Sequence, residues 1–152
     1  MSIGRIAQRN VDTADPHESV SQAAERMHQR NVGCLIILDD AGHPTGIVTD
    51  RDLVLRIVAP GKDAFTTMVK DVMTAWPVTC KEETPIEEAL ASMRRLQVRR
   101  LPVVGAQGEL LGIVTLDDII QLLAEEMTSI GRILSSETPA AAAAAGMREV
   151  VL

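Results

Sequence analysis

The chain repeats itself at a separation of 66 residues, and this repeat constrains the fold more than any other feature of the sequence. The stretch GIVTDRDLV begins at Gly46, and GIVTLDDII begins at Gly112. The match needs no gap from about residue 5 to 57 in the first copy and from 71 to 123 in the second. A sustained ungapped match indicates an internal duplication, so we expect two related structural units.

Each copy carries the same pattern of predicted elements. A short lead-in is followed by a helix with apolar residues at i, i+3, i+4 and i+7. Two strands joined by a turn come next, VGCLIILD and GIVT in the first copy and VRRLPVVG and GIVT in the second. A last helix begins at Thr49 or Thr115. The predicted fold class is α/β (mixed α+β), with one β-α-β-β-α unit used twice.

The predicted domain boundaries follow from the repeat and from changes in composition. One unit of about 55 residues buries too little surface to be stable alone, so the two units are expected to pack their apolar sheet faces together. We assign residues 1–58 to the first unit, 59–70 to a connector and 71–134 to the second unit. In 135–152, six alanines could extend a helix, but Pro139 and Gly146 bracket them and favour a flexible tail.

Composition excludes several classes of function. The sequence is 46% hydrophobic and 24% charged, which is typical of a globular protein. A net charge of −6 argues against nucleic-acid or anionic-membrane binding, and Phe65 and Trp76 are too few aromatics for stacking on single strands. No apolar run could cross a bilayer and no secretion signal is recognised, so a cytoplasmic location is expected. Cys34 and Cys80 lie in apolar segments and are interpreted as buried reduced thiols.

Catalytic and metal-binding patterns are not recognised in the sequence. His17, His28 and His43 are scattered and lack metal-ligand spacing. No nucleophile elbow, Walker loop or His-Glu-x-x-His motif occurs, so the chain is not expected to be an enzyme. An enzyme with an unrecognised site remains a distant alternative. A magnesium ion is expected only in company with a polyphosphate ligand.

The repeated Thr-x-x-Asp motif has two interpretations. Threonine followed three residues later by an acid is a capping-box pattern, with Thr49 as N-cap and Asp52 at N3. In that case Leu53, Val54 and Ile57 are expected to face the core.

The second interpretation is a ligand site. A helix N-terminus attracts anions, a threonine hydroxyl can bond phosphate or sugar, and a carboxylate can accept both hydroxyls of a ribose. Gly46 and Gly112 would allow a close approach to the backbone. The two interpretations are compatible, because a capped terminus is also a rigid one.

The ordered set of motifs resembles a tandem pair of CBS domains, also called a Bateman module. The residues that carry this resemblance are DVMTAWPVTC, VRRLPVV and GIVTLDDII within the duplicated unit, and it extends from about residue 5 to 127. It implies that the units pack by pseudo-twofold symmetry, with two clefts between their sheets. In the family these clefts commonly bind AMP, ADP, ATP, S-adenosylmethionine or NAD(H). It also implies a homodimer.

The resemblance transfers to individual positions of this chain. It implies ribose binding by the Thr-x-x-Asp residues, phosphate binding by a basic residue on the preceding strand and contact with the base by the lead-in. The implied ligand-binding residues are Thr49, Asp52, Thr115, Asp118, Arg99, Arg100, Thr13, Val78 and Thr79.

The two copies differ at one of these positions. Gly33 and Cys34 stand where the second copy has Arg99 and Arg100. Successive residues of a strand point to opposite faces, so only one arginine is expected to face a given cleft. We therefore expect one tighter nucleotide site per chain and one weaker or empty site.

The sequence as a whole indicates a non-catalytic regulatory module that senses an adenosine-containing ligand. AMP, ADP or ATP is the expected ligand, with S-adenosylmethionine and NADH as alternatives, and no cofactor is required. The module is expected to be a homodimer that acts on a separate effector protein of unknown identity. The alternative is a ligand-free interaction or scaffold module, in which Thr-x-x-Asp is only a helix cap.

Overall fold

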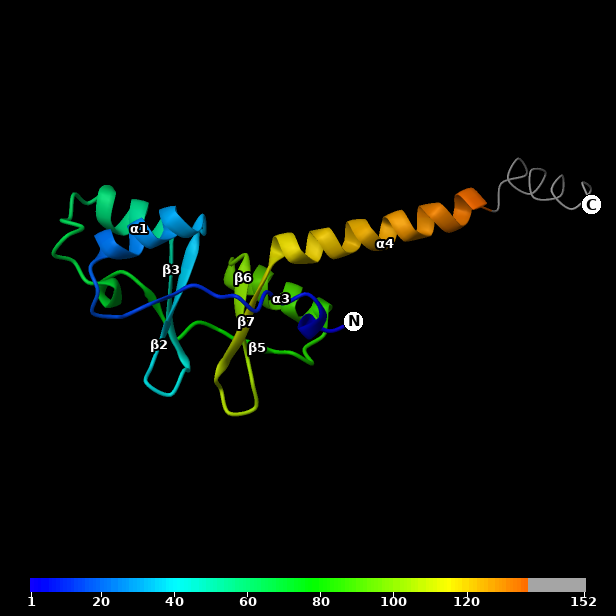
Figure 1. The fold of residues 1–152 in the computed structure, drawn as a ribbon, viewed down its shortest axis with the longest axis horizontal. Coiled ribbons are helices and arrows are strands. Elements are labelled where there is room, and N and C mark those ends of the chain that lie inside the picture. Colours follow the sequence, from blue (N-terminus) through cyan, green and yellow to red (C-terminus); the bar gives the residue numbers. More distant parts are fainter. Residues whose placement is uncertain (137–152) are drawn as a thin grey trace, which may run out of the picture. The chain divides into compact units, whose positions relative to one another are not determined.

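The computed structural model describes residues 1–136 and gives the predicted order of elements (Figure 1). Of the predicted tail, residues 137–152 lie outside the described part. The first repeat contains β1 (Thr13–Ala14), α1 (Val20–Arg30), β2 (Cys34–Leu38), β3 (Pro44–Thr49) and α2 (Asp50–Leu53). A π-helical turn, Val54–Val58, follows α2 directly. The second repeat contains β4 (Thr74–Ala75), β5 (Cys80–Lys81), α3 (Ile86–Leu96), β6 (Arg100–Val104), β7 (Leu110–Thr115) and α4 (Leu116–Ser136).

The mixed α+β class and its duplicated unit are confirmed. The strands form two sheets, with orders β1-β2-β3-β4 and β5-β6-β7. The 66-residue offset holds at the level of strand register: Cys34 pairs with Thr49 as Arg100 pairs with Thr115. Both hairpins also shift register at equivalent places, between Ile37 and Leu38 and between Val103 and Val104.

The two amphipathic helices end alike but begin differently. Asn31 and Gln97 are both left-handed C-caps, with φ of 52° and 54°. Helix α1 begins with a capping box between Ser19 and Gln22. Helix α3 begins after Pro85, which is its N-cap. There its fixed φ suits the entry into the helix, and its missing N–H removes no helical hydrogen bond.

The segments that precede each repeat's helix cross over to the other repeat. The lead-in of the second repeat adds an edge to the first sheet, where Thr74 pairs with Ile47. The lead-in of the first repeat adds the equivalent bridge between Gln8 and Ile113. Upstream, the Val69 N–H donates to the Glu18 carbonyl (3.0 Å), and the Ile3 N–H donates to the Thr84 carbonyl (2.9 Å). Each repeat therefore satisfies backbone groups of the other.

Both faces of the first sheet are covered. Leu35, Ile37 and Val48 pack on one face in a core cluster with α1 residues and Ile57. Ile36 points to the opposite face and has no exposed surface either. Burial on both faces explains why β2 is an uninterrupted apolar run instead of an alternating one.

One core prediction in this region is wrong. Leu53 and Ile57 contact the core cluster as expected, but Val54 is 55% exposed. Leu53 and Ile57 are four residues apart and share a helix face, whereas Val54 lies about 100° around the helix from Leu53.

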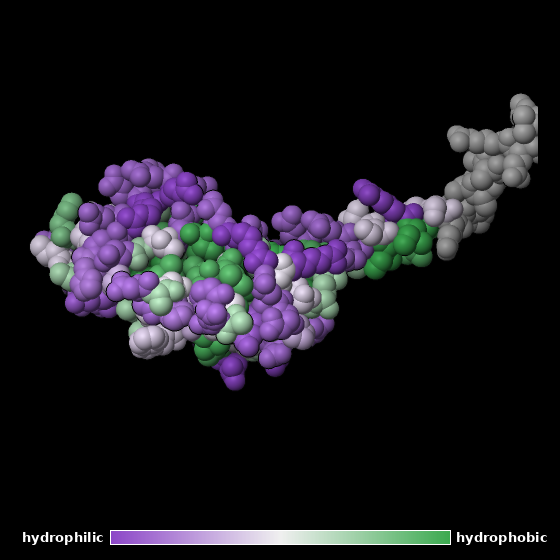
Figure 2. Space-filling view, turned by 60° about the horizontal axis from the view of Figure 1, so that its bottom comes forward, coloured by the Kyte–Doolittle hydropathy of each residue, from purple (hydrophilic) through white to green (hydrophobic). Residues whose placement is uncertain are grey.

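Helix α4 is a separate unit of the structure from Asp117 onward and is described by itself. Its 21 residues span about 32 Å. Ile119 and Leu122 are buried, but Leu123, Met127, Ile130 and Leu134 are 51–68% exposed. They give the C-terminal half of the helix a hydrophobic surface (Figure 2). None of the helices in residues 1–136 is long and apolar enough to span a membrane.

Candidate functional site

The first Thr-x-x-Asp motif forms a complete capping box. The Thr49 N–H donates to Asp52 Oδ2 (2.9 Å), and the Asp52 N–H donates to Thr49 Oγ (3.1 Å). Thr49 has extended backbone angles, with φ of −116° and ψ of 162°. The strand therefore delivers the chain into the helix with both side chains held in fixed positions.

This cap leaves bonding capacity on the carboxylate. Asp52 is half-buried, and its second oxygen, Oδ1, lies 3.5 Å from the Arg56 guanidinium. Each carboxylate oxygen can accept two hydrogen bonds. The Thr49 hydroxyl likewise accepts from Asp52 and keeps its own hydrogen to donate. The same geometry can therefore cap the helix and bind a vicinal diol.

The second motif lies at the equivalent strand-to-helix junction. Thr115 ends β7, Asp118 lies in the first turn of α4, and both are half-buried. In the first repeat the Asp50 N–H donates to the Gly33 carbonyl (3.0 Å), and in the second the Leu116 N–H donates to the Arg99 carbonyl (2.8 Å).

The structure separates the two candidate arginines. Arg100 pairs directly with Thr115 across β6 and β7, and alternation puts it on the same face as Pro102. Arg99 is exposed and shares the alternate face with Leu101. Arg100 is half-buried, and its guanidinium forms no hydrogen bond or ion pair with any residue in 1–136. Arg100 therefore lies directly opposite Thr115, while the Arg99 carbonyl accepts from the Leu116 N–H of the same motif.

The first motif has the opposite charge environment. Cys34 takes the place of Arg100 opposite Thr49. A Cβ added to Gly33 would lie only 3.2 Å from Asp50 Oδ2, so glycine makes room for this carboxylate. Asp50 corresponds to the apolar Leu116 of the second repeat. Our sequence analysis missed this additional acid, although the comparison of GIVTDRD with GIVTLDD contained the signal.

The two motif glycines have a different role from the one expected. A Cβ on Gly46 would meet the Met73 sulfur at 2.2 Å, and one on Gly112 would meet the Gln8 carbonyl oxygen at 2.6 Å. Both neighbours belong to the lead-in segments that cross over to the other repeat. These glycines therefore admit the protein's own chain, and the close approach of a ligand is not needed to explain them.

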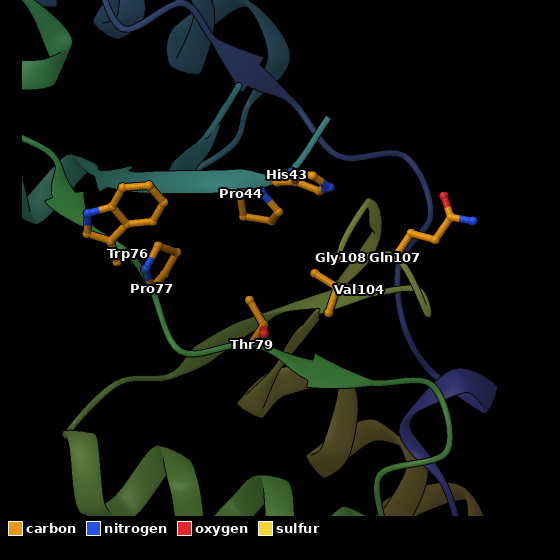
Figure 3. A pocket seen from close by; sticks show the side chains of 8 residues that line it. All are labelled: His43, Pro44, Trp76, Pro77, Thr79, Val104, Gln107 and Gly108. Carbon is orange, nitrogen blue, oxygen red and sulfur yellow. The ribbon is translucent and has the colours of Figure 1, made fainter. Parts of the chain in front are cut away.

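A cavity of about 390 Å³ lies at the other end of the strands (Figure 3). Its lining comes from the two hairpins and from the segment between β4 and β5: His43, Pro44, Trp76, Pro77, Thr79, Val104, Gln107 and Gly108. Pro44 and Thr49 are the two ends of β3, which at about 3.3 Å per residue puts them roughly 17 Å apart. Of the nine predicted ligand-binding residues, only Thr79 lines this cavity; Thr13 and Val78 are exposed elsewhere on the lead-ins.

The polar groups around this cavity are organised by Asp39. Its carboxylate accepts from the His43 N–H (2.8 Å) and the Ala41 N–H (2.9 Å), and lies 3.1 Å from His43 Nδ1. These hydrogen bonds, that from the His43 backbone first, lower the pKa of Asp39. The carboxylate is therefore charged at neutral pH and holds the imidazole at the rim.

The two cysteines are not paired with each other. Cys34 and Cys80 are both free, and burial raises the pKa of the Cys80 thiol to about 11, so it stays protonated. Cys34 is half-buried, which is less than expected. No group of His, Cys, Asp and Glu among residues 1–136 could hold a metal ion.

Comparison with known proteins assigns the class. A family model described as CBS domain matches the chain twice, at residues 3–59 and 69–125. The chain belongs to the CBS-domain family and carries two copies of the domain in tandem.

The chain is also similar in sequence to particular proteins. The chain is 36% identical over 122 residues to protein MK0525 of Methanopyrus kandleri, covering 80% of this chain and 62% of the relative. It is 38% identical over 109 residues to the CBS domain-containing protein YhcV of Bacillus subtilis, covering 72% of this chain and 76% of YhcV. This chain thus spans less than two thirds of MK0525.

A solved structure matches both repeats. It is the CBS domain pair of protein MJ0100 in complex with 5′-methylthioadenosine and S-adenosyl-L-methionine, with a TM-score of 0.74 and 26% identity. The match covers 83% of this chain and 98% of that one.

Proposed function

We propose that this chain is a non-catalytic regulatory module that binds an adenosine-containing ligand. The observation that carries the proposal is the capping box of Thr49 and Asp52, which is rigid yet retains acceptor capacity for a ribose. The occurrence of Thr-x-x-Asp at equivalent strand-to-helix junctions in a CBS pair supports it. The adenosine derivatives bound by the MJ0100 pair support the same class of ligand.

The predicted residues other than Arg99 each have a role in this proposal. Asp52 and Asp118 accept hydrogen bonds from ribose hydroxyls, and Thr49 and Thr115 donate to ribose or phosphate. The lead-in residues Thr13, Val78 and Thr79 contact the base. AMP, ADP or ATP is our first choice of ligand, and S-adenosylmethionine and NADH are alternatives.

The two sites are proposed to differ in affinity for phosphate. Arg100 beside Thr115 is a half-buried cation whose guanidinium suits a bidentate phosphate contact. At the equivalent place the first repeat has Cys34, together with the Asp50 carboxylate, which repels an anion. Each chain is therefore proposed to have one site with high affinity for nucleotides and one site with low affinity for phosphate-bearing ligands.

The module's output is proposed to be a change in shape or assembly passed to a separate effector protein. Leu123, Met127, Ile130 and Leu134 recur at i, i+4, i+7 and i+11 on α4, and their exposure supports a homodimer. The alternative function is a ligand-free interaction module. It is favoured by the same capping box, because the cap is complete without any ligand.

A thermal-shift panel tests the proposal. The panel contains AMP, ADP, ATP, NADH, S-adenosylmethionine and 5′-methylthioadenosine, with GTP as the guanine control. A ligand at about 100 times its Kd stabilises the folded state by about 2.7 kcal/mol, and at about 2–4 °C per kcal/mol this raises Tm by roughly 5–10 °C. If no adenosine compound shifts Tm or gives heat in calorimetry at millimolar concentration, the interaction-module alternative is the correct one.

A further inference from the structure

Helix α3, labelled in Figure 1, carries a stripe of exposed charged residues with one alanine in its middle. We call it the α3 stripe, and its members are Glu87, Glu88, Ala91, Arg94 and Arg95. The buried residues of the same helix are Ile86, Ala89 and Met93. At about 100° per residue, Ala91 lies at the centre of the stripe and on the opposite side of the helix from these buried residues. The stripe is therefore the outer face of α3.

The charged groups of the α3 stripe are not paired within the folded chain. None of the four side chains forms a hydrogen bond or ion pair with any residue in 1–136. The spacings of three and four residues that would pair an acid with a base on one helix do not occur among them. Acids in the first turn and bases in the last turn also complement the helix dipole, which is the alternative explanation to be tested.

The α3 stripe is complementary to itself in reverse order. At 1.5 Å per residue, Glu87 and Glu88 lie about 6 and 4.5 Å before Ala91 along the helix, and Arg95 and Arg94 lie the same distances after it. Two antiparallel copies of α3 that cross at Ala91 would therefore bring the acids of each copy level with the bases of the other. This is the self-complementary arrangement of a twofold dimer.

The central position of the stripe also suits a twofold axis. Packed helix axes lie about 8–10 Å apart, and the same residue of both copies meets itself where they cross. The methyl group of Ala91 leaves room for such an approach, whereas a long side chain would hold the two helices apart.

The first repeat has the equivalent helix without the stripe. At the 66-residue offset, α1 has uncharged side chains in place of the acids and only a histidine and a glutamine in place of the arginines: Ser21, Gln22, His28 and Gln29. Glu25 takes the place of Ala91, and two copies of its carboxylate would repel each other at a twofold axis. The fold thus does not require the α3 stripe.

We propose that the α3 stripe binds the same stripe on a second copy of this chain, antiparallel and centred on Ala91. This contact goes beyond the homodimer proposed for α4, because it is electrostatic and needs neither the adenosine ligand nor the apolar residues of α4. The screening length falls from about 10 Å at 0.1 M salt to about 3 Å at 1 M. Salt should therefore weaken the contact.

Ala91→Cys tests the position of the twofold axis. A disulfide needs about 3.5–4.5 Å between Cβ atoms, which only residues at the axis reach in both copies at once. At low salt, the full-length variant should form an intermolecular disulfide at least about tenfold faster than Glu25→Cys, its matched control on α1, and about 1 M salt should slow it about fivefold or more. Both variants retain Cys34 and Cys80, so the unmodified chain gives the background rate.

Charge reversal separates this contact from the helix-dipole explanation. Glu87→Lys/Glu88→Lys makes the stripe wholly positive, and Arg94→Glu/Arg95→Glu makes it wholly negative. Combined with Ala91→Cys, each should form the disulfide at least about fivefold more slowly than Ala91→Cys alone, because like charges then meet. A mixture of the two variants should recover the rate and give mainly the mixed disulfide, which mass spectrometry identifies.

Two results would overturn the proposal. One is an Ala91→Cys variant that forms the disulfide no faster than Glu25→Cys. The other is a mixture of the charge-reversed variants that reacts no faster than either alone, since the charges would then serve the helix dipole only. Light scattering on the unmodified chain keeps this outcome distinct from the fate of the α4 homodimer. A dimer whose Ala91→Cys variant fails to form the disulfide would refute the α3 contact and leave the α4 homodimer standing.

Discussion

The capping box of Ser19 and Gln22 has nearly the same geometry as that of Thr49 and Asp52, and this makes the role of Asp52 testable. Asp52 accepts from the Thr49 N–H at 2.9 Å, and Gln22 accepts from the Ser19 N–H at 3.0 Å. Asp52→Ala and Gln22→Ala each remove one such bond from the start of a helix. Only the first variant touches the predicted ligand site, so Gln22→Ala is its matched control.

The two variants should lose similar stability. Loss of a capping interaction costs about 0.5–2 kcal/mol. Asp52 also loses its pairing with Arg56, but at 3.5 Å and with the arginine 43% exposed this adds about 0–1 kcal/mol. For a chain of this size, about 1 kcal/mol corresponds to a fall in Tm of roughly 2–4 °C.

Ligand affinity should separate the two variants. A hydrogen bond to a charged group is worth about 1.5–3 kcal/mol, so Asp52→Ala should lower affinity for the adenosine ligand about 10- to 150-fold at its site. Gln22→Ala should leave affinity unchanged. Calorimetric titration of both variants, with Tm measured on the same samples, provides the comparison. Equal falls in Tm with unchanged affinity in both would refute the ribose role and leave Thr49 and Asp52 as a cap alone.

Three further predictions concern other parts of the chain. Arg100→Ala should weaken AMP binding about tenfold or more and adenosine binding much less. Equal losses of affinity for AMP and adenosine in calorimetry would show that Arg100 does not contact the phosphate. The double variant Leu123→Glu/Met127→Glu should convert a dimer into a monomer in light scattering, and a monomeric unmodified protein would contradict the role assigned to α4. Burial raises the pKa of Cys80 from 9.0 to about 11, so the unfolded chain loses this proton first as pH rises. The free energy of unfolding measured in urea should therefore fall between about pH 9 and 11. The fall should be smaller in Cys80→Ala; alanine is the residue that the first repeat has at the equivalent position, Ala14.

Much of the fold could be predicted because the duplication supplies the same evidence twice. Apolar spacing, turn residues and the capping pattern each occur in both copies. Every residue pair between β2 and β3, such as Cys34 with Thr49, has its equivalent 66 residues later between β6 and β7, such as Arg100 with Thr115. The start of α2 at Asp50 was predictable for the same reason, because a capping box is a local interaction whose partners are three residues apart.

Features that depend on distant segments could not be predicted. Gly46 makes room for Met73, and nothing in the sequence near Gly46 indicates that neighbour. The cavity of Figure 3 is lined in part by Trp76, whose positive φ has no signal in its residue type. The exposure of Val54 was missed because its neighbours Leu53 and Ile57 suggested a wider apolar face.

The exchanged lead-ins suggest how such a chain could have arisen. Thr74 adds to the first sheet as Gln8 adds to the second, so each unit completes the other by the same contacts. A single ancestral unit could have made these contacts with an identical copy of itself, in the manner of a domain-swapped dimer. Identical copies must carry identical sites, whereas a gene fusion gives each half its own codons. Only after fusion could one half hold Cys34 and the other Arg100 at the same place in the fold.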